Sequence, residues 1–133
     1  MKVILDTNVL ISGIFFKGPP YKILQTWRDN KIELIASEEI FEEYILVCER
    51  LQEQYPNIEI REIINLLAVN CKFYKQMEFE KQITADPDDD KFLACALAAG
   101  VKIIISGDKH LLDVNGYQNI EVISPADFLQ KYL

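Results

Sequence analysis

Two aspartates follow apolar runs that have the composition of buried strands. Asp6 comes directly after Val3-Ile4-Leu5, and Asp108 follows Ile103-Ile104-Ile105 after two small residues. Because parallel strands end at a common edge of a sheet, both carboxylates are expected at one rim, where they could serve as ligands for a hard cation. A plainer interpretation, in which each aspartate only caps the helix that follows it, stays open.

A second acidic group precedes the apolar segment 92–99 and consists of four aspartates within five residues: Asp86, Asp88, Asp89 and Asp90. These carboxylates repel one another, and a helix amino end stabilises only one or two of them. The others either stay in solvent or meet a cation. Asp90 lies directly against the apolar segment, so it is the member predicted to reach the sheet.

A fourth carboxylate comes from the segment 37–52, whose apolar residues fall on one broad helical face. Glu43 lies closest to the edge of that face, about 40° from Val47 at 100° per residue. Taken alone, Glu43 has the pattern of a solvated helix residue. Its significance comes from the three aspartates Asp6, Asp90 and Asp108.

Four oxygen ligands without a usable His or Cys set describe a site for Mg²⁺ or Mn²⁺. Converging carboxylates need such a cation, because they repel one another otherwise. The ion would activate water and neutralise charge at a phosphate, so phosphodiester hydrolysis is the natural reaction class. With 14 basic and 21 acidic side chains, the formal net charge is −7. A nucleic acid therefore cannot be held by bulk positive potential, and the ion would have to screen the acidic protein.

The elements that must position these residues alternate between strands and helices. Strands are predicted over 2–5, 32–36, 71–74, 101–105 and 120–123. Helices are predicted over 9–12, from the break Gly18-Pro19-Pro20 through Trp27, and over 37–52, 58–70 and 91–99. Shorter ones are predicted near 111–112 and after Ser124-Pro125, and a polar turn is predicted over 6–8. Continuously apolar strands favour a parallel sheet covered on both faces. No linker divides the chain, so one domain over 1–133 is expected.

Composition excludes several other classes. Half of the 133 residues are apolar and 26% are charged, which is incompatible with disorder. No apolar run approaches the roughly 18 residues of a membrane span, and no export signal is evident, so a cytoplasmic protein without a membrane partner is expected. The odd number and apolar surroundings of Cys48, Cys71 and Cys95 predict reduced core thiols.

Four segments together resemble the PIN domain family, whose members include the VapC-type toxins of toxin–antitoxin pairs: VILDTNVLIS, SEEIFEEY, DPDDDKFLACALAAG and IIISGDKHLL. The resemblance covers nearly the whole chain and implies a three-layer α/β/α sandwich around a mainly parallel sheet. It places the acidic quartet of the family, catalytic and metal-binding, on Asp6, Glu43, Asp90 and Asp108.

The same resemblance implies supporting roles for Asn8, beside the first aspartate, and for Ser106, which precedes the last. His110 departs from the pattern, because close relatives usually have an aspartate there; it is either a phosphate or water contact or a surface histidine. Lys91 and Lys109 are the candidate phosphate contacts. For the toxin group, the resemblance implies cleavage of single-stranded RNA, an antitoxin partner and a homodimer.

Other interpretations remain beside this one. Ser106, Asp108 and His110 are the residue types of a hydrolytic triad, but residues two apart in a turn rarely make its contacts. Aspartyl-phosphate chemistry at Asp6 would not require Glu43. A catalytically silent PIN-like module that binds RNA or protein is the third alternative. Aromatic residues do not discriminate, because Phe15, Phe16, Tyr21 and Trp27 fit either a core or an exposed partner surface.

Overall fold

The sheet that carries the fold has five parallel strands. The computed structural model describes residues 1–75 and 81–133. The strands are β1 (Lys2–Leu5), β2 (Glu33–Ala36), β3 (Lys72–Phe73), β4 (Ile103–Ile105) and β5 (Glu121–Ile123). They lie in the order β3-β2-β1-β4-β5, and every neighbouring pair is parallel. The predicted parallel α/β architecture is confirmed.

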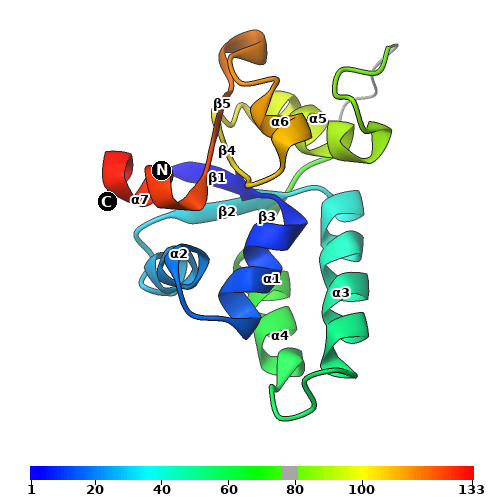
Figure 1. The fold of residues 1–133 in the computed structure, drawn as a ribbon, viewed down its shortest axis with the longest axis vertical. Coiled ribbons are helices and arrows are strands. Elements are labelled where there is room, and N and C mark those ends of the chain that lie inside the picture. Colours follow the sequence, from blue (N-terminus) through cyan, green and yellow to red (C-terminus); the bar gives the residue numbers. More distant parts are fainter. Residues whose placement is uncertain (76–80) are drawn as a thin grey trace.

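Helices cover both faces of this sheet. They are α1 (Thr7–Phe15), α2 (Pro19–Arg28), α3 (Glu38–Gln52), α4 (Ile60–Asn70), α5 (Asp90–Ala99), α6 (Lys109–Leu112) and α7 (Pro125–Tyr132), with short 3₁₀ helices η1 (Pro87–Asp89) and η2 (Tyr117–Asn119). Figure 1 shows α1, α2 and α4 on one side of the sheet and α5 and α6 on the other. The fold is therefore the three-layer α/β/α sandwich that the resemblance implied.

The core lies between these layers and is built from the apolar strand residues and the helix faces that meet them. Its largest fully buried side chains include Leu10, Ile40, Phe92, Ile104 and Phe128. Almost every residue of β1, β2, β4 and β5 is buried or half-buried, as expected for a sheet that is covered on both faces. This burial fixes the strand ends, and with them the residues that follow.

The strand order reverses between β1 and β4, which is where open α/β sheets form their sites. From β1 the chain runs outward through β2 to β3 and then returns to the other side of β1 as β4. Leu5 pairs with Ile105 in the register. The ladder continues beyond both strands, because the Asp6 amide donates to the Ile105 carbonyl at 2.9 Å. Asp6 and Ser106 consequently lie side by side at the switch point.

Two element boundaries differ from the sequence predictions. The polar turn predicted over 6–8 is wrong, since α1 begins at Thr7 immediately after the strand. The Asp6 carbonyl accepts from the amides of Val9 and Leu10, so the helix starts without an intervening turn. In addition, β3 is only two residues long, because pairing with β2 stops at Phe73.

Several predicted terminators act as expected. The Ser37 hydroxyl accepts from the Ile40 amide at 3.2 Å and caps α3. Gly100 ends α5 at φ +69°, a conformation that favours glycine.

In α1, a Cβ at Gly13 would lie 2.6 Å from Leu24 Cδ1 of α2, so glycine is required for the close approach of the two helices.

The three cysteines are buried and form no disulfide, as predicted. Burial raises the pKa of the Cys48 thiol to about 11 and the pKa of both Cys71 and Cys95 to about 12. Over residues 1–75 and 81–133, none of the helices has both the length and the apolar character that crossing a membrane requires.

Candidate acidic site at the carboxyl edge of the sheet

Asp6 and Asp108 are joined through Ser106. Asp6 is only 4% exposed, and its Oδ2 accepts from Ser106 Oγ at 2.8 Å. The same Ser106 Oγ accepts from the Asp108 amide at 2.9 Å. Ser106 is fully buried, so it fixes the first acidic side chain and the backbone of the last one against the core. Ser106 thus contacts both aspartates, Asp6 at its carboxylate and Asp108 at its amide.

The capping interpretation applies to one of these aspartates only. Asp108 Oδ1 accepts from the His110 amide at 2.8 Å and caps α6. The Asp6 carboxylate makes no such contact, although Asp6 stands at the N-cap position of α1. A buried carboxylate that does not cap its helix calls for another explanation.

Glu43 reaches the same edge from α3. Tyr44, the next residue, is buried and donates its hydroxyl to the Leu5 carbonyl, which ties α3 to the end of β1. Thr7 Oγ1 donates to Glu43 Oε2. Lys91 Nζ of α5 lies 2.8 Å from Glu43 Oε1, and the Lys91 side chain is only 13% exposed. Lys91 therefore belongs to the acidic group and is not a solvated lysine.

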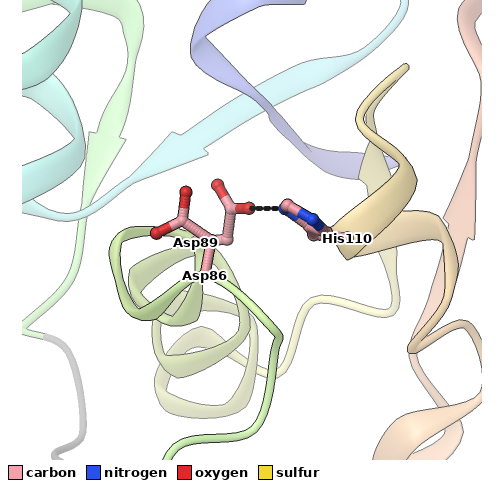
Figure 2. Close-up of side chains that lie close together, drawn as sticks. All are labelled: Asp86, Asp89 and His110. Carbon is pink, nitrogen blue, oxygen red and sulfur yellow. Dashed lines mark ion pairs between the residues drawn. The ribbon is translucent and has the colours of Figure 1, made fainter.

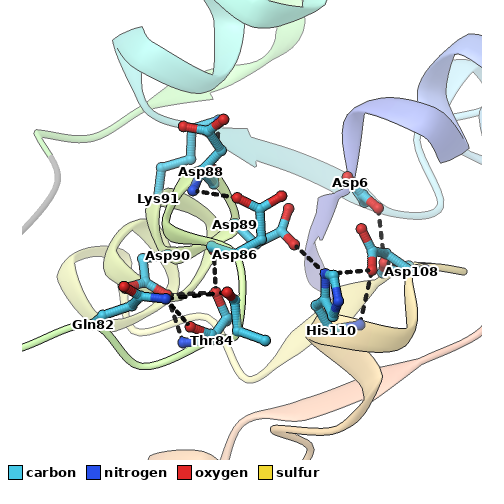
Figure 3. A network of polar contacts seen from close by, with 12 residues as sticks. Asp6, Gln82, Thr84, Asp86, Asp88, Asp89, Asp90, Lys91, Asp108 and His110 are labelled. Atoms are coloured by element: carbon cyan, nitrogen blue, oxygen red, sulfur yellow. Dashed lines mark hydrogen bonds and ion pairs between the residues drawn. The ribbon is translucent and has the colours of Figure 1, made fainter.

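The structure separates Asp90 from the other acids (Figure 3). Its carboxylate accepts from the amides of Ile83 and Thr84 at 2.9 and 2.8 Å, and from Thr84 Oγ1 at 2.8 Å. Asp90 thus holds the segment before η1 against α5. Its neighbour Asp89 is 8% exposed and is directed toward Asp6 and Asp108 instead. Successive helical residues point about 100° apart, so only one of the two aspartates can face the sheet edge.

The pKa of Asp89 also places this residue, rather than Asp90, close to Asp6 and Asp108. Burial, followed by repulsion from Asp108, Asp6 and Asp86, raises the pKa of Asp89 from 3.8 to about 6. Burial is likewise the main reason why the pKa of Asp6 is raised; the Ser106 hydrogen bond opposes it, and Asp108 and Glu43 add to it. Asp89 Oδ2 is buried and has no hydrogen-bond partner among the described residues.

The remaining predicted residues lie around this group. His110 is exposed, with Nδ1 at 3.7 Å from Asp108 Oδ1 and 4.0 Å from Asp89 Oδ2. Lys109 and Asn8 are also exposed. Asn8, Gly107 and Asp108 line a hollow of about 300 Å³ beside the acids. Ser106 Oγ bonds to Asp6 and the Asp108 amide, not to His110, so the triad arrangement is not formed.

The residues fit a divalent cation. An orphaned buried carboxylate oxygen and two buried aspartates with raised pKa values describe a place where negative charge lacks compensation. Asp6, Asp89 and Asp108 do not have their oxygens within 4.8 Å of one another, because the one described trio that does so is Asp86, Asp89 and His110. An ion here would be bound directly by one or two of these carboxylates and through its own waters by the rest, which is how proteins commonly hold Mg²⁺.

Three contributors were not identified from the sequence. Thr7 and Tyr44 act through single hydrogen bonds to distant elements, for which local pattern carries no signal. Asp89 was one of the four clustered aspartates, but the sequence does not separate it from Asp90, because the orientation of the two depends on η1 and on the hydrogen bond from Thr84 to Asp90.

In a parallel α/β/α sandwich the switch point of the sheet is where ligands bind, and buried acids at that point can hold a divalent cation. The family model described as PIN domain matches residues 2–110. The chain belongs to the PIN domain family, whose members are typically metal-dependent nucleases. Comparison with curated proteins and with solved structures gave no significant match.

Proposed function

We propose that this PIN domain is a Mg²⁺- or Mn²⁺-dependent endoribonuclease that hydrolyses phosphodiester bonds of single-stranded RNA, and that it serves as the toxin of a toxin–antitoxin pair. The observation that carries the nuclease assignment is the buried Asp89 carboxylate, which has an unpartnered oxygen and faces Asp6 and Asp108. The family match supports the reaction class. The toxin role, with an antitoxin as partner and a homodimer as assembly, is proposed from the resemblance alone.

In this proposal Asp6, Asp89 and Asp108 hold the cation, and Glu43 completes the acidic set. Asp89 takes the place that the sequence had assigned to Asp90. The divalent ion would supply Lewis acidity and lower the pKa of a water that attacks the phosphate. Ser106 keeps Asp6 oriented by its hydrogen bond, and burial keeps the acidic group away from bulk water.

Basic residues around the acids would receive the RNA backbone. Lys91 is already fixed by Glu43 and by the Asp88 carbonyl, which accepts from its ammonium at 2.6 Å. Lys109 lies exposed at the start of α6, next to Asp108, and His110 follows it. An RNA phosphate bridging this rim would meet the positive charges of Lys91 and Lys109.

The test is incubation of the purified chain with mixed single-stranded RNA in Mg²⁺, in Mn²⁺ and in EDTA. Cleavage is expected with metal, and none with the chelator. Asp6→Asn and Asp89→Asn should each lower the rate by at least about 10²-fold, the scale of losing one charge-stabilising group. Asp88→Asn is the matched control, since its side chain is exposed and it changes the same charge in the same loop. Cleavage that persists in EDTA would overturn the proposal.

One observation favours a catalytically silent module as the second candidate. Glu43 is already neutralised by Lys91 and hydrogen-bonded to Thr7, so it needs no metal to be stable. A silent module would retain RNA or a protein partner without cleaving it. Aspartyl-phosphate chemistry at Asp6 is distinguished by Glu43→Gln, which would leave activity nearly intact under that scheme and would reduce it in the nuclease.

A further inference from the structure

The hollow of about 300 Å³ beside Asp108 lies next to the acidic site and is not part of it. Of the acids assigned to the nuclease site, only Asp108 lines this hollow. Figure 2 shows the part of the site where the Asp89 carboxylate is directed at His110, and neither of these residues lines the hollow. Figure 1 shows α3 on one side of α1 and α2 with α7 on the other. The hollow lies on the side of α2 and α7, because both helices contribute to its walls.

The walls of the hollow are apolar. Val9 of α1, Pro20 of α2 and Pro125 of α7 form them. Among the described residues that line the hollow there is no lysine, arginine or histidine, so a phosphate would find no counter-charge in it. A flat and neutral group suits such walls, and unstacked bases of nucleic acids pack between apolar side chains in this way. The walls therefore favour the base of a nucleotide over its phosphate.

Two polar side chains of α1 offer hydrogen bonds to a group in the hollow. Asn8 and Ser12 both line it and are one helical turn apart, so they lie on the same face of α1. Within residues 1–75 and 81–133, neither the Asn8 amide nor the Ser12 hydroxyl has a hydrogen-bond partner. An amide side chain carries a donor and an acceptor side by side, which is the pattern that pairs with the edge of a base.

Gly107 keeps the hollow open next to Asp108. The φ angle of Gly107 lies outside the left-handed region, and a Cβ at this position would meet nothing within 4 Å. Neither the backbone conformation nor the packing of the protein therefore requires glycine here. Because Gly107 lines the hollow and precedes Asp108, its missing side chain leaves a ligand free to reach from the hollow to the acids.

We infer that the hollow receives one unpaired nucleobase of the single-stranded substrate, which belongs to a nucleotide next to the phosphate held at the acids. The volume of about 300 Å³ fits a single small group, because it lies at the lower end of the range of small-molecule pockets. The inference rests on the proposed function for its substrate and adds a base-binding role for Asn8 and Ser12. A paired and stacked base would not enter, so the hollow requires a single strand.

Nucleosides test the hollow without phosphate, metal or cleavage. In a ¹⁵N-labelled chain kept in EDTA, each of the four nucleosides is added at millimolar concentration, with ribose as the control. At least one nucleoside should shift the resonances of the Asn8 side-chain amide and of the backbone amides of Ser12 and Gly107, whereas ribose should leave them in place. Absence of any nucleoside effect, or an equal effect of ribose, would overturn the inference.

Two variants test where the base lies. Gly107→Leu adds a side chain at the open edge of the hollow and should abolish the nucleoside effect on Asn8 and Ser12. Ser12→Ala should weaken nucleoside binding about three- to tenfold, the loss of one hydrogen bond. Ala68→Leu is the control for the added side chain and should bind as the wild type does, because Ala68 is exposed on α4 and does not line the hollow. Wild-type binding by a folded Gly107→Leu contradicts the assignment; should that variant fail to fold, unchanged binding by Ser12→Ala contradicts it.

An abasic RNA distinguishes a base within the strand from a free nucleoside. Replacing the base on either side of the cleaved phosphate, one at a time, should in one case lower kcat/KM at that bond at least about tenfold, since the polar groups of the hollow lose their partner. Undiminished cleavage of both abasic strands would overturn the inference in favour of a site for free nucleosides. Nucleoside binding without cleavage of any RNA would reject the proposed function alone. Metal-dependent cleavage without nucleoside binding would reject this inference alone.

Discussion

Two adjacent aspartates have opposite roles in this protein. Asp89 is a buried carboxylate surrounded by other acids, and its pKa is raised to about 6. The Asp90 carboxylate is satisfied by three hydrogen bonds from residues 83 and 84. Asp89 destabilises the metal-free fold, and a cation would relieve that effect. Asp90 stabilises the fold through its hydrogen bonds to residues 83 and 84. Single substitutions at the two positions should therefore have opposite effects on stability.

Asp89→Asn should stabilise the metal-free protein. Because the pKa of Asp89 is higher in the folded state than its ordinary 3.8, the folded chain binds the proton more tightly, and the free energy of unfolding falls as the pH rises from about 4 to above 6. Asparagine removes that penalty, which is on the order of 1–2 kcal/mol at neutral pH. Thermal melting in EDTA at pH 5 and pH 7.5 measures it. The prediction is contradicted if the wild-type melting midpoint does not fall between pH 5 and pH 7.5 and the midpoint of Asp89→Asn changes in the same way.

The same variant should lose the stabilisation that divalent metal gives the wild type. Millimolar Mn²⁺ should raise the wild-type melting midpoint, because an ion that binds only the folded state adds RT ln(1 + [L]/Kd) to its stability. Asp89→Asn should show at most a small part of that shift, and Asp88→Asn should retain it in full. Equal shifts in all three proteins would mean that the metal acts elsewhere.

Asp90→Asn should destabilise the fold without affecting the binding of metal. The amide keeps one acceptor but presents its own N–H groups toward the donors of residues 83 and 84, so a loss of about 1–3 kcal/mol is expected. Denaturant unfolding measures the loss, and the Mn²⁺-induced shift in the melting midpoint should persist. Disappearance of the metal shift in this variant would restore Asp90 as the ligand that the sequence indicated.

At this scale the metal site predicted from the sequence stays a prediction, and the structure shows that the Asp90 carboxylate is hydrogen-bonded to Ile83 and Thr84. Asp108 and Glu43 both act on Asp6 electrostatically, so the three acids lie near one another, and each is tied to a strand end or to a helix with a clear apolar face. The choice between Asp89 and Asp90 depended on the rotation of α5 about its axis. That rotation is set by the 3₁₀ turn η1 and by the loop bonds to Thr84, which local periodicity does not report.

The elements were predicted well because their signals are local. Strands with continuous Ile, Val and Leu, the Ser37 cap and the Gly100 terminator each act within a few residues. The start of α1 was predicted wrongly, because Asp6 and Thr7 are polar residues of the kind that are common in turns. Their backbone joins the strand ladder and the helix directly, and their side chains contact Ser106 and Glu43, which are distant in sequence.

Contact between α1 and α2 depends on Gly13, and Gly13→Ala should destabilise the protein by about 1–3 kcal/mol. The added Cβ would lie 2.6 Å from Leu24 Cδ1 and 2.8 Å from the Pro20 carbonyl oxygen, so the two helices would have to separate. Gly107→Ala is the control, because a Cβ there would meet nothing within 4 Å. Equal midpoints in chemical denaturation for the two variants would show that the helices adjust without cost.

The whole molecule is acidic, yet its proposed substrate is a polyanion. With a formal net charge of −7, attraction to RNA must come from the bound cation and the few lysines at the rim. Of the aromatic residues considered as a partner surface, Phe16 is exposed and contacts Tyr55, whereas Phe15 and Trp27 are buried. Tyr21 is half-buried, so two of the four aromatic residues belong to the core, and the antitoxin contact remains a proposal.

Binding of RNA should consequently require metal and depend only weakly on salt. Fluorescence anisotropy with a labelled single strand that has a cleavage-resistant backbone should show binding in Mn²⁺ and release on addition of EDTA. The slope of log K against log salt should be no steeper than about −2, since each lysine–phosphate contact contributes about −0.7 for single strands. Tight binding in EDTA with a steep slope would indicate a separate basic surface.

The three buried thiols can report which part of the fold opens locally. Cys48 lies on α3, Cys71 directly follows α4 and Cys95 lies on α5. A cysteine is therefore present in or next to helices on both sides of the sheet. Buried thiols with pKa values of about 11 to 12 react with alkylating reagents only when they are uncovered and ionised. Mass spectrometry of timed iodoacetamide labelling would thus rank the three regions by how readily each detaches, with no engineered probe.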